Sequence, residues 1–177
     1  MRCPPLALAF MLVAGPAAAA VVDAQPGGFE VERTAAIAAS PEKVYAALIQ
    51  PGHWWTSEHT FSGDAHNLTV DPRAGGCWCE TLKNGGSAQH MRVVYADPGK
   101  ALRVLGGLGP LQALGVEGAL TWTIKPALGG GVTLTQTYVV GGYAPGGLAN
   151  LAAPVDGVLG LQLARLKAYV ETGRPTP

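Results

Sequence analysis

The stretch APVDGVLGLQLARLKAYVET, residues 153–172, is the most informative for the fold, because it predicts one long amphipathic helix after a series of strands. Its apolar residues recur at three- and four-residue intervals, which places them on one face of an α-helix. Pro154 suits the first turn of this helix, and Gly173 followed by Pro175 predicts its end. The residues on the apolar face are Val155, Val158, Leu159, Leu163, Leu166, Tyr169 and Val170.

Two glycines interrupt this helical pattern. Gly157 and Gly160 each lower the stability of a helix by about 1 kcal/mol relative to alanine. Small residues at these positions permit a close approach by another part of the molecule. Either the helix contacts the sheet closely there, or the glycines leave room for a ligand.

The segments that precede this helix alternate apolar and polar residues with a period of two, which predicts β-strands. Glycine-rich or proline-containing turns separate them, and the strongest hairpin signal is NGG at 84–86. A first strand is predicted at 29–38, and Ser40 is a good N-cap for a helix that Pro51 ends. The other predicted strands are 68–72, 75–82, 88–97, 100–107, 118–127 and 131–140.

An antiparallel sheet with one strongly amphipathic helix must bury one of its faces under that helix. We therefore predict an α+β fold in which a curved antiparallel sheet wraps around the long C-terminal helix, with two short helices after the first strand. A length of 177 residues suits one domain, which we place at 29–173. Lys plus Arg and Asp plus Glu number 12 each, so no basic footprint for nucleic acid exists. Small-molecule or protein partners remain, and the oligomeric state is left open.

The N-terminal residues predict a cleaved export signal at 1–20, with cleavage as late as residue 24 as the alternative. Arg2 supplies a positive start, an apolar run follows at 6–13, and small residues follow at 15–20. We expect a periplasmic or secreted protein without stable membrane insertion after signal removal. Cleavage removes Cys3 and leaves two cysteines in an oxidising compartment.

Those cysteines, Cys77 and Cys79, lie in the segment GGCWCE. Residues i and i+2 of a regular strand are about 6.6 Å apart, so a disulfide between them would need a bulge. Zinc would need two further ligands, which makes these cysteines weak metal candidates. We favour the interpretation that both are small buried hydrophobes facing the core. We therefore predict no metal site and no cofactor.

The opposite face of the same hairpin carries the leading catalytic candidates. A regular hairpin centred near Gly85 places Glu80 opposite His90, with Arg92 on the same face. A carboxylate that orients an imidazole, beside an arginine, suits proton transfer. Because the apolar set lies with the cysteines, however, we favour an exposed ion pair of little energetic value. Glu58 and His59, in the aromatic segment 53–63, form a second acid–base candidate.

The chain resembles the START-like, helix-grip superfamily, in the branch near polyketide cyclases and activators of heat-shock-protein ATPase. The segments that carry the resemblance are SPEKVYAALIQPGHWW, AGGCWCE, VVYADPGKALR and QLARLKAYVETG. The resemblance implies a cavity between the sheet and the long helix for an apolar small molecule or lipid. Because apolar cavities favour aromatic and branched walls, the predicted lining is Trp54, Trp55, Phe61, Trp122, Tyr138, Tyr143, Leu159 and Leu163.

We predict that the protein binds an apolar or aromatic small molecule or lipid in this cavity. The alternative is an enzyme of cyclase or dehydratase type that uses the acid–base candidates. A third interpretation is a protein-interaction module, as in the co-chaperone branch. An exported protein would not meet a cytosolic chaperone, and the chain has no phosphate-binding GxxxxGK[ST] pattern.

Overall fold

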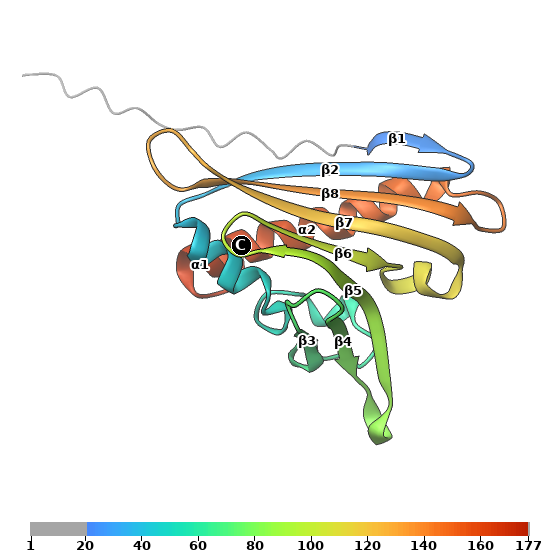
Figure 1. The fold of residues 1–177 in the computed structure, drawn as a ribbon. Coiled ribbons are helices and arrows are strands. Elements are labelled where there is room, and N and C mark those ends of the chain that lie inside the picture. Colours follow the sequence, from blue (N-terminus) through green and yellow to red (C-terminus); the bar gives the residue numbers. More distant parts are fainter. Residues whose placement is uncertain (1–20, 177) are drawn as a thin grey trace, which may run out of the picture.

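The computed structural model describes residues 21–176 and shows one curved antiparallel sheet packed around a long C-terminal helix (Figure 1). The predicted export signal at 1–20 lies outside the described residues. The sheet has the strand order β1-β2-β8-β7-β6-β5-β4-β3, so its ends are not joined into a barrel. The predicted α+β helix-grip fold is therefore confirmed.

The elements follow the predicted order, with short 3₁₀ turns between them. The strands are β1 (Val21–Gln25), β2 (Gly28–Ile37), β3 (Leu68–Val70), β4 (Cys77–Thr81), β5 (Ser87–Asp97), β6 (Ala101–Gly106), β7 (Gly115–Pro126) and β8 (Val132–Tyr143). The α-helices are α1 (Pro41–Leu48) and α2 (Ala152–Thr172). The 3₁₀ turns are η1 (Pro51–His53), η2 (Ser57–His59), η3 (Ala65–Asn67), η4 (Lys83–Gly85), η5 (Gly109–Ala113) and η6 (Ala149–Leu151).

Helix α1 begins where the capping signal predicts. The side chain of Ser40 accepts a hydrogen bond from the backbone N–H of Lys43, and Pro41 occupies the first turn. Strand β1, in contrast, was not predicted. Its sequence VVDAQ is exposed along its whole length and has no alternating pattern, so only its pairing with β2 makes it a strand.

Helix α2 packs its apolar face on the sheet, but that face also holds a buried ion pair. The guanidinium of Arg33, on β2, donates from Nε and Nη2 to the two carboxylate oxygens of Asp156, at 2.6 Å each. A Cβ atom at Gly160 would lie 2.5 Å from Cζ of Arg33. Gly160 therefore makes room for a side chain of the sheet rather than for a ligand, whereas a Cβ at Gly157 would meet nothing within 4 Å.

The hairpin of β4 and β5 departs from the regular register that the sequence predicts. Trp78 pairs with Met91 and Cys79 pairs with Gln89, so His90 is one extra residue in β5. This is a β-bulge, and it places His90 and Met91 side by side on the buried face.

Two sequence predictions for this hairpin are wrong. Cys77 and Cys79 are half-buried on the outer side of β4 and form a disulfide with a Cα–Cα distance of 5.3 Å, so they are not free thiols facing the core. The inner side of β4 carries Trp78 and Glu80 instead. The preferred interpretation of Glu80 and His90 as a solvent-exposed pair is therefore also wrong, since both side chains are buried. A disulfide was expected only if the strand that carries the cysteines had a bulge, whereas the extra residue, His90, lies in the neighbouring strand β5.

Candidate functional site

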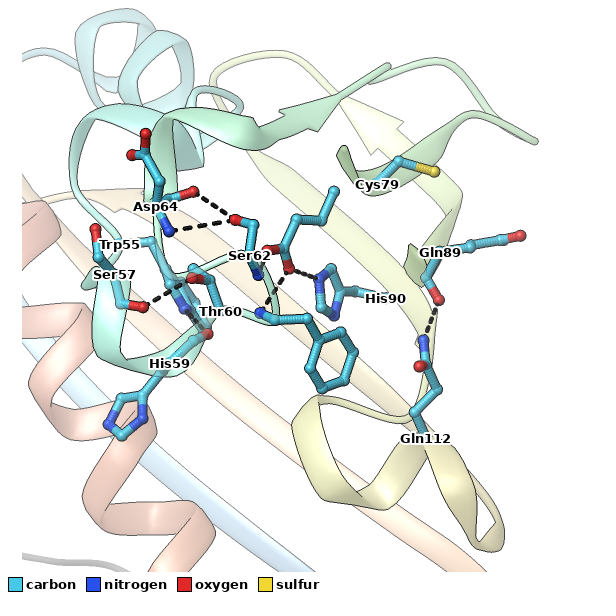
Figure 2. Close-up of polar contacts among 12 residues, drawn as sticks. Trp55, Ser57, His59, Thr60, Ser62, Asp64, Cys79, Gln89, His90 and Gln112 are labelled. Carbon is cyan, nitrogen blue, oxygen red and sulfur yellow. Dashed lines mark hydrogen bonds and ion pairs between the residues drawn. The ribbon is translucent and has the colours of Figure 1, made fainter. Parts of the chain in front are cut away.

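A cavity of ≈ 490 Å³ opens between the sheet, the first half of α2 and two covering segments. One covering segment is residues 55–61, here called the cap, and the other contains η5. Figure 2 shows His59 and Thr60 of the cap on one side of His90, and Gln112 of η5 on the other. The lining consists of Trp55, Glu58, His59, Thr60, Phe61, Leu68, Trp78, His90, Leu108, Gly109, Pro110, Leu111, Leu114, Leu151, Pro154, Val155, Val158 and Leu159. This volume lies within the range of about 300–1,000 Å³ that is typical of small-molecule pockets.

Local hydrogen bonds explain the shape of the cap. The indole N–H of Trp55 donates to the carbonyl of His59 at 2.9 Å, and the hydroxyl of Thr60 donates to the carbonyl of Ser57 at 2.7 Å (Figure 2). Contacts with α2 hold the cap in place. The backbone N–H of Thr56 donates to Oε1 of Gln162 at 3.0 Å, and the guanidinium of Arg165 donates to the carbonyl of Trp55 at 3.4 Å. These bonds join the cap to the helix.

The polar centre of the cavity is the pair Glu80–His90, of which His90 lies on the wall. Nε2 of His90 lies 2.8 Å from Oε2 of Glu80, and these residues are 7% and 1% exposed (Figure 2). Glu80 also accepts hydrogen bonds from the backbone N–H groups of Phe61 and Ser62. The carboxylate therefore joins β4, the bulge of β5 and the end of the cap.

These contacts fix the ionisation of Glu80. Burial raises the pKa of this carboxyl group, but hydrogen bonds from Ser62, Phe61 and His90 outweigh burial, and the pKa lies below its ordinary value. An ionised carboxylate only accepts hydrogen bonds, so Nε2 of His90 must carry a proton. In the neutral imidazole, Nδ1 then has a free lone pair.

An aromatic ring covers the imidazole. The rings of Phe61 and His90 are stacked, with centroids 5.2 Å apart and planes inclined by 24°. Phe61 is 50% exposed and lies in the cap. Glu58 and His59 also line the cavity, but their side chains are exposed, which places this second acid–base candidate at the rim.

The segment around η5 is held by Tyr138. Its hydroxyl donates to the carbonyl of Gly106 at 3.0 Å and accepts from the backbone N–H of Leu108 at 3.3 Å. Burial raises the pKa of this phenol to about 12, although the hydrogen bond from Leu108 lowers it. Tyr138 thus positions one cover of the cavity and does not itself line it.

Three of the predicted lining residues, Trp55, Phe61 and Leu159, lie on the cavity wall. The other predicted residues lie elsewhere. Trp54, Trp122, Tyr138 and Leu163 are buried in the core outside the cavity lining. Tyr143 is 73% exposed, and Arg92 points to solvent, away from the Glu80–His90 pair.

Several wall residues were missed. Val155 and Val158 belong to the apolar stripe of α2, so the helical spacing could have identified them. Leu108, Leu111 and Leu114 come from the sequence LGPLQAL, in which leucine recurs at every third residue, the period of the 3₁₀ turn η5, and this short signal was not used.

No group of three or more His, Cys, Asp or Glu side chains within residues 21–176 could hold a metal ion. The disulfide also occupies the two thiol groups that were considered as weak metal candidates. Over the same range, no helix is both long and apolar enough to cross a membrane.

A family model described as polyketide cyclase / dehydrase and lipid transport matches residues 28–171. The chain belongs to this family. The resemblance to START-like proteins is thereby confirmed, and the cavity is lined by residues that lie within the matched range. No match was found among curated protein sequences.

Solved structures of other proteins share the fold of this family member. A conserved protein of unknown function from Enterococcus faecalis, EF2215, is 17% identical, with a TM-score of 0.60 over 87% of this chain and 78% of that one. CalU16 from Micromonospora echinospora is 14% identical, with a TM-score of 0.56 over 85% of this chain and 78% of its own. DynU16, a protein of the dynemicin biosynthetic locus, is 21% identical with a TM-score of 0.55, and the match covers 82% of this chain but 48% of DynU16.

Proposed function

We propose that this protein binds an apolar small molecule or lipid chain in the cavity between the cap, the sheet and α2. The observation that carries the proposal is the cavity itself, which has a volume of ≈ 490 Å³ and a wall made mainly of apolar and aromatic side chains. Burying apolar surface in such a space favours binding by about 25 cal/mol per Å². The family to which the chain belongs includes lipid transport in its description, which supports the same function.

We also propose that the mature protein works outside the cytoplasm. The N-terminal sequence has the pattern of an export signal, and a disulfide joins Cys77 and Cys79. Strand β1 spans Val21–Gln25 and pairs with β2. Cleavage after Ala20 would keep this strand whole, whereas cleavage after Ala24 would remove most of it, so we favour the earlier site.

A cavity-filling substitution tests the binding function. Val158 lines the cavity from α2, while Leu161 lies on the same helix and is 40% exposed. The uncharged fluorescent probe N-phenyl-1-naphthylamine should bind the wild-type protein and gain fluorescence. Val158→Trp should abolish this gain, because the larger ring fills the ligand space, and Leu161→Trp should keep it. Absence of binding to the wild type, or equal loss in both variants, would contradict the proposal.

The Glu80–His90 pair favours a second candidate function, acid–base catalysis on a bound carbon acid. A carboxylate that holds one nitrogen of an imidazole leaves the other nitrogen available to abstract a proton. Benzoylacetone in deuterated water provides a test, since proton abstraction is seen as exchange of its central protons in an NMR spectrum. Exchange above the buffer rate should disappear in His90→Phe and persist in His66→Phe, a matched change at a side chain that is 81% exposed. Exchange at the buffer rate in the wild type rejects this second function.

A further inference from the structure

The cavity wall includes a buried imidazole, that of His90, and in its neutral form Nδ1 is a hydrogen-bond acceptor. Nε2 of the same ring is taken by Glu80 at 2.8 Å. Among residues 21–176, no group donates to Nδ1, and this atom is not one of the two fully enclosed side-chain nitrogens without a partner, Trp78 Nε1 and Gln162 Nε2. Because His90 lines the cavity, the free lone pair is open to whatever occupies it.

Glu80 sets the tautomer of the neutral imidazole from the side away from the cavity. The carboxylate of Glu80 is held by the backbone N–H groups of Phe61 and Ser62 and is 1% exposed. Since it can only accept, it keeps the imidazole proton on Nε2. Its negative charge also makes the imidazole a stronger acceptor at Nδ1, as happens in other carboxylate–histidine pairs.

The surroundings of His90 are otherwise poor in polar groups. Phe61 stacks on the imidazole with ring centroids 5.2 Å apart, and Trp78 and Leu111 belong to the same wall. The polar side chains Glu58 and His59 stand at the exposed rim. An apolar ligand that carries no donor would therefore leave Nδ1 buried and unpaired, which is costly.

We propose that the ligand is an apolar molecule with a weakly acidic hydroxyl group, a phenol or an enol, which donates its hydrogen bond to Nδ1 of His90. This inference rests on the proposed binding function and names its ligand class. An ionised carboxylic acid is disfavoured, because it would place an acceptor against an acceptor, with the charge of Glu80 behind the ring. A planar aromatic body also suits a wall that contains Trp55, Phe61 and Trp78.

Four naphthalene compounds of nearly equal shape test the proposal by displacement of N-phenyl-1-naphthylamine at neutral pH. They are naphthalene, 2-methoxynaphthalene, 2-naphthol and 2-naphthoate. 2-Naphthol should bind about tenfold more tightly than 2-methoxynaphthalene, since only the hydroxyl donates to Nδ1. In His90→Phe this ratio should fall to about one, while His66→Phe should keep the wild-type ratio.

The outcomes separate the two proposals. If the probe does not bind the wild type at all, the binding function fails. If the probe binds and all four compounds displace it equally, or 2-naphthoate binds best, the cavity binds ligands but the hydroxyl class is wrong. If His90→Phe does not fold, the ratio of the affinities for 2-naphthol and 2-methoxynaphthalene in the wild-type protein alone tests the hydroxyl class.

Discussion

His90 reaches Glu80 because a β-bulge turns it inward. Regular pairing continued from Trp78 and Met91 would set His90 opposite Cys79, on the outer side of the sheet. The extra residue places the imidazole on the buried side instead, where Nε2 lies 2.8 Å from Oε2 of Glu80. The polar centre of the cavity therefore depends on one irregularity in one hairpin.

Glu80→Gln should destabilise the protein, although it changes the size of the side chain little. An amide presents one oxygen and one NH₂ group, whereas the carboxylate presents two acceptors, to Phe61, Ser62 and His90. In either orientation the NH₂ group faces a backbone N–H. We expect a loss of about 1–3 kcal/mol in the free energy of unfolding at neutral pH, measured by urea denaturation. A change close to zero would show that these contacts are not important for stability.

The effect of Glu80→Gln should also depend on pH. Burial raises the pKa of Glu80, but the hydrogen bonds lower it further, so the folded pKa lies below the unfolded one. The contribution of a carboxylate with a depressed pKa is complete above the unfolded pKa and is lost as the pH falls through the folded pKa. The difference between the wild type and the variant should therefore shrink below about pH 4. A difference that stays constant into acid would contradict this account.

The two glycines of α2 should respond in opposite directions to alanine. At Gly160 the new Cβ would lie 2.5 Å from the Arg33 guanidinium, which cannot move without disturbing its ion pair with Asp156. We expect Gly160→Ala to lower stability by about 1–3 kcal/mol. Gly157→Ala meets nothing within 4 Å and should raise stability by about 0.5–1 kcal/mol through helix propensity. Thermal unfolding of both variants checks the pair, and equal shifts would disprove the close packing at Gly160.

Removal of the disulfide should weaken ligand binding as well as stability. The bridge closes a very short loop, so the double variant Cys77→Ser/Cys79→Ser should lose about 1–2 kcal/mol. Without the bridge, β4 can extend from the 5.3 Å Cα–Cα distance towards the spacing of a regular strand, about 6.6 Å. Since Trp78 and Glu80 alternate with the cysteines, the cavity wall should loosen. Titration with N-phenyl-1-naphthylamine should show a weaker affinity in this variant. An unchanged affinity would show that the shape of the cavity wall does not depend on the disulfide.

Alkaline pH should destabilise the cover that contains η5. Burial raises the pKa of Tyr138 to about 12, and a raised folded pKa means that stability falls as the pH rises from the unfolded value towards the folded one. The free energy of unfolding should therefore decrease between about pH 10 and pH 12. Tyr138→Phe should remove most of this dependence while lowering stability at neutral pH. If the free energy of unfolding of Tyr138→Phe falls between about pH 10 and pH 12 as it does in the wild type, another group causes the effect.

Local signals in the sequence were sufficient for the fold. The capping pattern at Ser40 predicted α1, period-two alternation predicted seven of the eight strands, and the apolar stripe of residues 153–172 predicted α2. Strand β1 was not predicted, because its residues are all exposed and form a strand only by pairing with β2. Such pairing produces no periodic pattern in the sequence.

The site was harder to predict, because one inserted residue changes the face of every residue beyond it. The cross-strand pair Glu80–His90 was identified, yet the cysteines were assigned to the core and this pair to solvent, the reverse of the actual arrangement. No sequence signal marks the bulge at His90. The cover around η5 was missed for a related reason, since irregular segments take their shape from contacts such as that of Tyr138 with Leu108.

Ligand binding in the cavity beside Trp55 and Trp78 can be tested most directly through the indole N–H signals of the four tryptophans. Trp54 serves as the internal control, because it is 1% exposed, lies outside the lining and donates to the carbonyl of Ala47. In a ¹H–¹⁵N NMR titration with N-phenyl-1-naphthylamine, with signals assigned by single Trp→Phe variants, Trp55 and Trp78 should shift far more than Trp54. A larger shift of Trp54, or no shift of any indole at saturating probe, would contradict the account.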